Sequence, residues 1–205
     1  TYLKMDIHTK RNLELTENLR TKERTYSLLW LLDKTKTAMG SRMLKQMIEN
    51  PLIDKEEIEN RYDMVSKLLE EFLLKDELKE LLNEVYDLER LAGRVSFGNA
   101  NARDLLQLKS SLKVLPRIKE IVSILGFNLV IDDLTDLYEF LDKSIYENPP
   151  ITLKEGYLIK SGYNKELDDL KLARSGGKDF IAKLEEKEKE RTGIKNLRVG
   201  YNRVF

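Results

Sequence analysis

The residues best suited to a chemical role lie in the last part of the chain, residues 191–205. Four cations and no acid occur there; the cations are Arg191, Lys195, Arg198 and Arg203. Amide and phenol side chains are interleaved with them, at Asn196, Tyr201 and Asn202. Cations and side-chain amides are groups that bind phosphate oxygens. A basic strand edge that only resists aggregation has the same composition, and charge count alone favours neither interpretation.

Other kinds of catalytic or metal site find little support in the residue types. The chain has no cysteine, which excludes disulfides, thiol nucleophiles and cysteine zinc sites. Its one histidine, His8, cannot form a multi-histidine metal site. A Ser-His-Asp triad is excluded unless it uses His8. Residues 175–178 (SGGK) have the glycines of a phosphate loop but not its spacing, and Asp179 follows the lysine. The charges of residues 183–191 alternate in sign and indicate a solvated helix.

The composition is typical of a helical protein without a dominant charge. With 205 residues, 41% hydrophobic and 35% charged, the chain can form one or two domains with a core. Cations and acids number 36 each, so any electrostatic binding needs a local patch. The sequence contains no signal peptide and no apolar run of membrane-spanning length. It starts with Thr1 rather than methionine, which suggests a piece of a longer protein.

The elements that must position the basic residues are mostly helices. Residues 26–51 form the most apolar window and contain the only tryptophan, Trp30, which predicts a buried helical hairpin that the later helices pack against. Apolar stripes at helical spacing follow between residues 54 and 145 and predict the seams of a helical core. Asp54 and Asn101 are the candidate N-caps of two of these helices.

Several helix boundaries in this region are less regular. One helix is expected to carry the apolar positions from Leu78 to Val95 without interruption. Pro116 should bend or break the helix that begins after Asn101, because proline lacks a backbone N–H. Either Asp132 or Asp133 should cap the helix after that. Residues 175–177 (SGG) should interrupt the helical stretch between Asn164 and Arg191.

Short β elements are expected at both ends of the helical part. Alternating apolar residues predict strands in residues 3–7 and 12–15, and a small hairpin is expected in residues 151–159. The alternation of Leu197, Val199 and Tyr201 predicts a strand with one buried face. Because this strand runs into Phe205, we expect the chain to stop inside a small sheet.

Five blocks of sequence follow one another in order along almost the whole chain. They are Met5-Asp6 with Thr9 and residues 11–15 (RNLEL); residues 27–33 with 37–44 (TAMGSRML) and 51–52; residues 87–91 (DLERL) with Arg94 and residues 103–105; residues 161–168 (SGYNKELD); and residues 190–194 (ERTGI) with 197–202 (LRVGYN) and Val204. In these blocks the chain resembles the MutS family of bacterial DNA mismatch-repair proteins.

This resemblance implies a mainly α fold: an elongated multi-helix core and lever bundle, with a small β element at the N-terminus and a partial α+β clamp at the C-terminus. It places the core and lever domain at residues 1–167 and the start of the clamp at residues 168–205. In the family, the levers connect an ATPase domain to clamps that close around duplex DNA. Neither the family's Phe-x-Glu mismatch-reading motif nor a Gly-x-x-x-x-Gly-Lys-Ser/Thr loop occurs here. Mismatch reading, ATP and magnesium are therefore expected outside this chain.

The resemblance also implies partners and a location. The implied partner is double-stranded DNA, and the parent protein is expected to be a homodimer that contacts other mismatch-repair proteins. No membrane contact is expected, and the expected location is the cytoplasm, at the nucleoid. The candidate contacts to the DNA backbone are Lys195, Asn196 and Arg198, with Arg174 and Lys178 beside the glycine pair as weaker candidates. This chain alone should bind duplex DNA weakly, because its patch has no second clamp opposite it.

Two alternatives remain open at this point. Neutral net charge and abundant amphipathic helix also fit a helical scaffold or adaptor that binds protein and not DNA. A helical enzyme has less support, because the sequence offers no metal set, no activated nucleophile and no cofactor loop.

Overall fold

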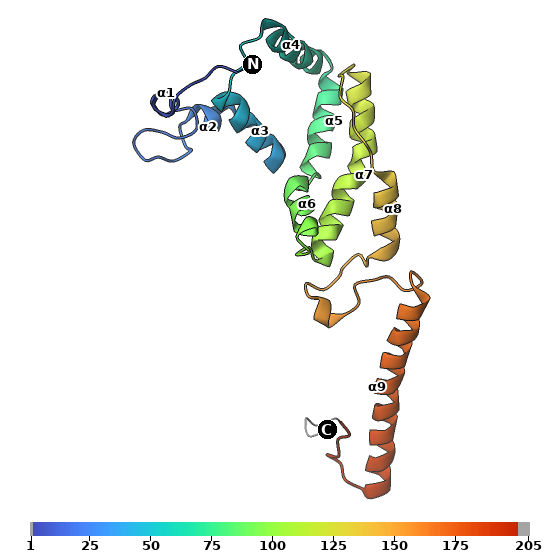
Figure 1. Cartoon of the computed structure of the whole chain (residues 1–205). Coiled ribbons are helices and arrows are strands. Elements are labelled where there is room, and N and C mark those ends of the chain that lie inside the picture. Colours follow the sequence, from blue (N-terminus) through green and yellow to red (C-terminus); the bar gives the residue numbers. More distant parts are fainter. Residues whose placement is uncertain (1, 201–205) are drawn as a thin grey trace. The chain divides into compact units, whose positions relative to one another are not determined.

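The computed structural model describes residues 2–200; residue 1, residues 201–205 and the side chain of Lys178 lie outside the described part. The chain divides into two compact units, Thr1–Leu158 and Ile159–Phe205. The helices are α1 (Ile7–Asn12), α2 (Leu28–Leu32), α3 (Ala38–Glu49), α4 (Lys55–Glu70), α5 (Phe72–Asn83), α6 (Leu88–Ser96), α7 (Ala102–Ile124), α8 (Thr135–Ser144) and α9 (Lys165–Thr192), with a 3-10 helix at Leu153–Glu155 (Figure 1). The predicted mainly α fold is thereby confirmed. The domain boundary predicted after residue 167 falls in the first turn of α9 and stays a prediction.

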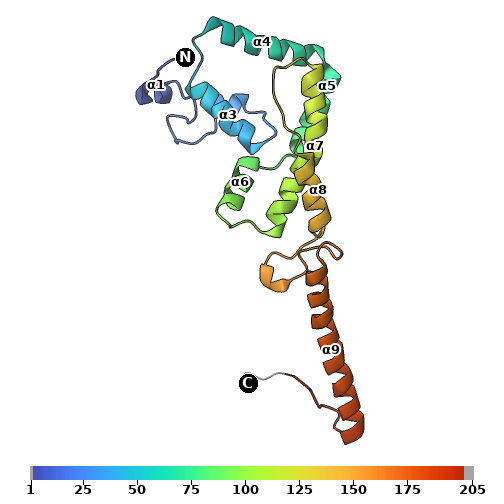
Figure 2. The ribbon, with the colours of Figure 1, turned by 45° about the vertical axis from the view of Figure 1, so that its right-hand side comes forward.

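The core of the first unit is organised around α7. This helix packs against α5, α6 and α8, and two views of the ribbon show α5 and α8 beside it (Figures 1 and 2). Leu112 and Ile121 on α7 are 1% and 0% exposed. Leu112 belongs to a cluster with Leu141 and Ile145 of the α8 region, while other faces of α7 pack against α5. A long helix with apolar residues on several faces therefore forms the centre.

The prediction that residues 26–51 form the buried anchor of the fold is wrong. The window does contain two helices, α2 and α3, but α2 is only five residues long. Leu29 is 4% exposed, whereas Trp30 is 46% and Leu31 is 61% exposed. A helix of little more than one turn can bury only one face, so the other apolar side chains of α2 stay at the surface.

Two of the predicted helix starts are confirmed by their capping hydrogen bonds. The Asp54 carboxylate accepts from the Glu57 backbone N–H at 3.0 Å at the start of α4. Asn101 and Asp104 form a reciprocal capping box at the start of α7, in which each side chain accepts from the other residue's backbone N–H at 2.9 Å. The two partners of each cap are only three positions apart, so the cap can be predicted from the sequence.

The single helix expected from Leu78 to Val95 is wrong, and of the bend or break expected at Pro116 the break is wrong while the bend stays a prediction. The helix expected from Leu78 to Val95 is two helices, because α5 ends at Asn83 and Asp87 caps α6 by accepting from the Arg90 N–H. The helix α7 continues through Pro116 without a break, with the buried residues Val114 and Ile118 on either side of the proline. Burial of these neighbours offsets the lost backbone hydrogen bond.

The expected cap of α8 is also wrong, because its N-cap is Leu134 rather than Asp132 or Asp133. Leu134 has a positive φ of 48°, and its backbone N–H donates to the Asp132 carboxylate at 3.0 Å. Asp132 thus stabilises the turn before the helix, two residues earlier than a cap would lie.

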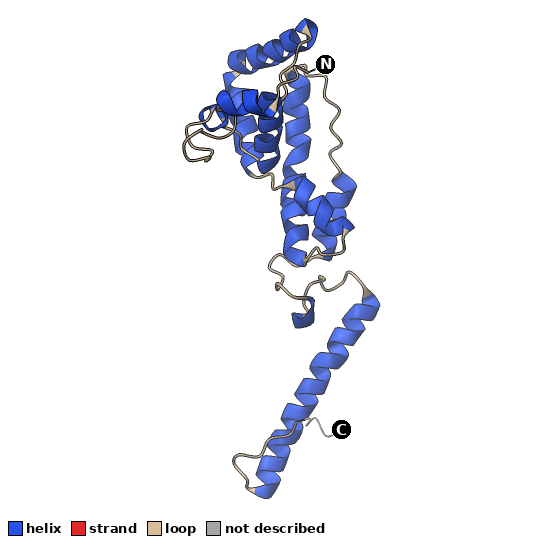
Figure 3. Cartoon of the chain, turned by 60° about the vertical axis from the view of Figure 1, so that its left-hand side comes forward, coloured by secondary structure: helices blue, strands red, loops and turns tan. Residues whose placement is uncertain are grey.

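The described residues contain no strand (Figure 3). At the N-terminus an isolated antiparallel bridge joins Tyr2 to Leu52, and the predicted strands are replaced by α1 and a turn. Asp6 explains the difference, since its carboxylate accepts from the Thr9 N–H at 2.7 Å and starts a helix at Ile7. The expected hairpin at residues 151–159 is instead the 3-10 helix Leu153–Glu155.

The α+β clamp predicted at the C-terminus appears, in the described residues, as helix α9 and an irregular segment. Residues 197–200 have no strand geometry, and Tyr201 to Phe205, which include Arg203, lie outside the described part. The α component of the prediction is therefore present, and a strand is not found as far as residue 200.

Candidate nucleic-acid interface

The second unit is built on α9, whose two ends are both fixed by hydrogen bonds. The Asn164 side chain caps the start by accepting from the Leu167 N–H at 2.9 Å. Asp168 accepts from the Gly162 N–H at 2.7 Å, which ties the preceding loop to the first turn. At the other end Gly193 adopts a φ of 71°, which favours glycine, and its N–H donates to the Lys189 carbonyl at 2.9 Å.

The helix α9 continues through Gly176 and Gly177, so the predicted break at residues 175–177 is wrong. Glycine in a helix interior costs about 1 kcal/mol relative to alanine but does not end a helix by itself. Arg174 and Lys178 therefore belong to the same continuous helix, four residues apart, a spacing that places two positions on one helix face. The Arg174 side chain is exposed.

The segment after α9 folds back along the helix. After the Gly193 cap, the Leu197 N–H donates to the Ile194 carbonyl at 3.3 Å and forms a turn. The Val199 N–H then donates to the Glu185 carboxylate on α9 at 3.1 Å. Glu185 thus holds the returning segment, which contains Lys195, Asn196 and Arg198, against the last turns of the helix.

Glu185 is a residue of the candidate interface that has no role in the predictions made from the sequence. Hydrogen bonds from Lys189 and from the Val199 N–H lower the pKa of its carboxyl group, and the positive charge of Arg198 contributes to the same shift. The carboxylate is therefore ionised at neutral pH. The spacing of Glu185 and Lys189 is a readable signal of a helix ion pair, but the contact with Val199 joins positions 14 apart and leaves no local pattern.

The candidate cations differ in how far their charge is compensated. Lys195, Asn196 and Arg198 are exposed. Within the part of the chain that the structure describes, none of Lys195, Arg198 and Arg174 forms an ion pair with a carboxylate. Arg191 differs, because its Nη2 lies 2.7 Å from the Glu188 carboxylate.

The structure brings only some of the predicted residues together. Lys195, Asn196 and Arg198 are close in the returning segment, beside the part of α9 that contains Glu185. Arg174 lies eleven residues before Glu185, which corresponds to about 16 Å along a helix axis. The candidate positions are therefore spread over this length of α9 and over the segment that returns beside it. One DNA strand carries a phosphate about every 3.4 Å along the duplex axis, so positions spread over this length suit several phosphates.

Two further observations bear on the kind of site. Among residues 2–200, no group of three or more histidine, cysteine, aspartate or glutamate side chains could hold a metal ion. None of the helices in this described part is both long and apolar enough to cross a membrane.

Comparisons with known proteins relate the chain to a repair protein. The family model described as MutS domain III matches residues 8–198. Proteins called "DNA mismatch repair protein MutS" from Bacillus cytotoxicus, Bacillus cereus and Bacillus thuringiensis are each 56% identical to it. Each match covers 100% of this chain and 24% of the relative. The chain therefore spans about a quarter of the length of these relatives.

Proposed function

Because the chain belongs to the MutS family, whose domain III it matches, we propose that it is the DNA-clamping and lever module of a mismatch-repair protein. The family match over residues 8–198 is the observation that carries this proposal. In this role the second unit contacts duplex DNA, and the helices of the first unit transmit the bound state to the rest of the protein.

The DNA contacts in this proposal are to the sugar-phosphate backbone. Lys195, Asn196 and Arg198 make them, together with Arg174 and Lys178 on α9. The described cations Lys195, Arg198 and Arg174 are exposed and, among residues 2–200, form no ion pair with a carboxylate, which supports this assignment, since a cation outside an ion pair is available to a phosphate. Such contacts position a protein on DNA without reading base sequence.

The lever part of the proposal depends on stiff elements. The 23-residue α7 is buried along several faces and the 28-residue α9 is continuous, which suits both to transmitting movement. Nucleotide hydrolysis, ATP and magnesium belong, in this proposal, to the part of the protein beyond this chain. The working protein is a homodimer that contacts other repair proteins, in the cytoplasm at the nucleoid.

Charge reversal at Arg198 tests the DNA-binding role. In the full-length protein, Arg198→Glu should weaken binding to duplex DNA by roughly tenfold, because one phosphate contact is replaced by repulsion. Helix content measured by circular dichroism should not change. Lys113→Glu is the matched control, since Lys113 is an exposed lysine on α7 outside the proposed interface. Equal affinity of the Arg198→Glu and wild-type proteins would reject the assignment of Arg198.

A protein-binding scaffold is the second candidate function, and one observation favours it. Large apolar side chains on α4 and α5 are exposed, among them Tyr62 (66%), Leu69 (66%) and Leu73 (81%). Exposed apolar groups of this size suit a contact with protein. Stable self-association of the chain in light scattering, without any affinity for duplex DNA, would favour this function over the first.

A further inference from the structure

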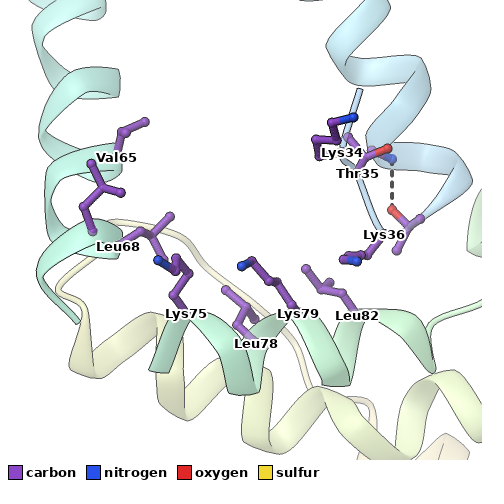
Figure 4. Close-up of a pocket in the computed structure, with 12 residues that line it drawn as sticks. Lys34, Thr35, Lys36, Val65, Leu68, Lys75, Leu78, Lys79 and Leu82 are labelled. Atoms are coloured by element: carbon purple, nitrogen blue, oxygen red, sulfur yellow. Dashed lines mark hydrogen bonds between the residues drawn. The ribbon is translucent and has the colours of Figure 1, made fainter. Parts of the chain in front are cut away.

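A polar hollow of about 380 Å³ lies in the N-terminal part of the first unit, between α1, the loop that connects α1 to α2, and α3. It differs from the larger groove of about 440 Å³ at residues 34–37, α4 and α5, where Figure 4 shows leucine and valine side chains. The volume of the polar hollow is in the range of sites that bind small molecules. Six of the side chains that line it are charged: Lys10, Arg11, Lys22, Lys45, Glu17 and Glu49.

The charged groups of the polar hollow do not neutralise one another in pairs. Among the described residues, none of its four cations and neither of its two carboxylates forms an ion pair. Four cations against two carboxylates leave a net charge of +2. The cations come from three separate segments, since Lys10 lies on α1, Lys22 in the loop and Lys45 on α3. Lysine and arginine side chains outside ion pairs bind phosphate through charge-assisted hydrogen bonds.

The loop that carries Lys22 is held in place by Asn18. The Asn18 amide group donates to the Thr21 hydroxyl at 2.7 Å and to the Thr25 carbonyl at 2.9 Å. Its side-chain oxygen accepts from the Thr21 N–H at 2.7 Å. Lys22 follows with a positive φ of 57°, which is uncommon for a lysine, and its N–H donates to the Asn18 carbonyl at 3.1 Å. A wall that is already fixed in this way loses little conformational entropy when a ligand binds.

Both signs of charge in one hollow restrict the class of ligand. A phosphate monoester carries about two negative charges at neutral pH, which match the net charge of the lining. A carboxylate can only accept hydrogen bonds, and the hydroxyl groups of a sugar donate to such a group, as ribose does in dinucleotide-binding proteins. A long polyanion such as nucleic acid suits the hollow less well, because Glu17 and Glu49 repel successive phosphates.

We propose that the polar hollow binds a small phosphorylated molecule that carries hydroxyl groups, of the sugar-phosphate class. The four cations hold its phosphate, and the two carboxylates accept hydrogen bonds from its hydroxyl groups. This inference goes beyond the proposed function, because the site belongs to the first unit and involves neither duplex DNA nor the cations of the second unit.

Titrations of the 205-residue chain with three probes test the proposal. The probes are ribose 5-phosphate, inorganic phosphate and ribose, and binding is followed by the NMR chemical shifts of the backbone amides. Ribose 5-phosphate should bind saturably and about tenfold more tightly than inorganic phosphate, while ribose should cause no shifts. The shifted amides should lie in α1, residues 16–22 and α3. Equal affinities for the two phosphates, shifts elsewhere, or no saturation would overturn the proposal.

Two variants separate the roles of the cations and the carboxylates. Lys45 is exposed on α3, and Lys45→Glu should weaken binding of ribose 5-phosphate by about tenfold, while the control Lys113→Glu leaves it unchanged. Glu17→Gln should strengthen binding of inorganic phosphate, because a repulsive charge is removed, and should lower the preference for ribose 5-phosphate by about threefold. No effect of Lys45→Glu, or an unchanged preference in Glu17→Gln, would contradict the assigned roles.

A single-stranded oligonucleotide is the competing probe, because nucleic acid offers the same phosphate chemistry. It should not displace ribose 5-phosphate from the polar hollow. If it did so and bound there more tightly than ribose 5-phosphate, with the same loss of affinity in Lys45→Glu, the polar hollow would be a nucleic-acid site and the sugar-phosphate assignment would be wrong.

Discussion

Arg42 on α3 holds Asp87, the N-cap of α6, through two parallel hydrogen bonds. Its Nη1 lies 2.8 Å from Asp87 Oδ2, and its Nη2 lies 2.8 Å from Oδ1. Glu89 also pairs with Arg42. The two partners are 45 positions apart, and both lie in blocks that resemble the MutS family. This ion pair connects α3 to α6, which packs against α7. The apolar side chains of α2 and α3 are mostly exposed or half-buried and contribute little to the same connection.

Replacement of Asp87 by asparagine should weaken this connection specifically. Asp87→Asn keeps an oxygen that can cap α6 but removes the charge that pairs with Arg42. The free energy of unfolding should fall by about 1 kcal/mol, a value reduced from that of a buried pair because Arg42 is half exposed. Urea unfolding followed by the fluorescence of Trp30, the only tryptophan, gives this quantity.

The matched control is Asp76→Asn. Asp76 pairs with Lys79 on the surface of α5, within one helix, and its loss should change the free energy of unfolding by less than about 0.5 kcal/mol. If the two variants were equally stable, the Arg42–Asp87 pair would have no connecting role.

The same pair predicts a dependence on pH. Hydrogen bonds from Arg42 lower the pKa of Asp87 from its usual 3.8 to about 2. A carboxyl group whose pKa is lowered by folding stabilises the fold above its unfolded pKa and loses that contribution as the pH falls through the folded value. The stability difference between wild type and Asp87→Asn should therefore be constant above about pH 4 and shrink toward pH 2. A difference that stays constant down to pH 2 would contradict the assignment.

Mutations should show whether α7 or the apolar window at residues 26–51 contributes more to the core. Ile121→Ala removes a fully buried side chain and should lower the free energy of unfolding by about 2–5 kcal/mol. Leu31→Ala removes a side chain of the same size that is 61% exposed, and it should cost less than about 1 kcal/mol. Denaturant unfolding of both variants gives the two free energies of unfolding. A larger decrease for Leu31→Ala than for Ile121→Ala would place the core in residues 26–51.

Alanine at Gly176 should stabilise α9. The glycine lies inside a continuous helix, and no atom lies within 4 Å of an added Cβ. The gain should be about 0.5–1 kcal/mol, measured by amide hydrogen exchange along α9. Gly193→Ala is the control with the opposite expected effect, because the φ of 71° at Gly193 strains a residue with a side chain. It should weaken the protection of amide hydrogens from exchange at the end of α9. Faster exchange in Gly176→Ala would indicate that the helix is interrupted there.

Local features of the fold could be predicted from the sequence, and long-range ones could not. The caps at Asp54 and Asn101 involve partners three residues away, so the pattern contains the whole interaction. The exposure of Trp30 could not be read in this way, because the local count of apolar residues does not show which stripe other helices will cover. The longer helix α7 packs against α5, α6 and α8, so tertiary packing determines which apolar residues are buried.

In the candidate site too, local features could be predicted from the sequence and long-range contacts could not. The basic composition of the end of the chain was visible in the sequence, and the roles of Lys195, Asn196, Arg198, Arg174 and Lys178 stay predictions. The sequence did not reveal that Glu185 fixes the returning segment, since a carboxylate that accepts from a distant backbone N–H has no sequence signature. The expected break at Gly176 was wrong because glycine propensity is a weak term within a capped helix of 28 residues.

The salt dependence of duplex binding tests the central claim most directly. The proposed interface has four cations, Lys195, Arg198, Arg174 and Lys178, and four neutralised phosphates give a slope of log affinity against log salt of about −3.6. Fluorescence anisotropy with a labelled duplex should show this slope for the 205-residue chain, with weak binding overall, and a slope reduced in magnitude by about 1 for Arg198→Glu. A slope near zero, or the same slope in both proteins, would contradict a backbone contact by these four cations.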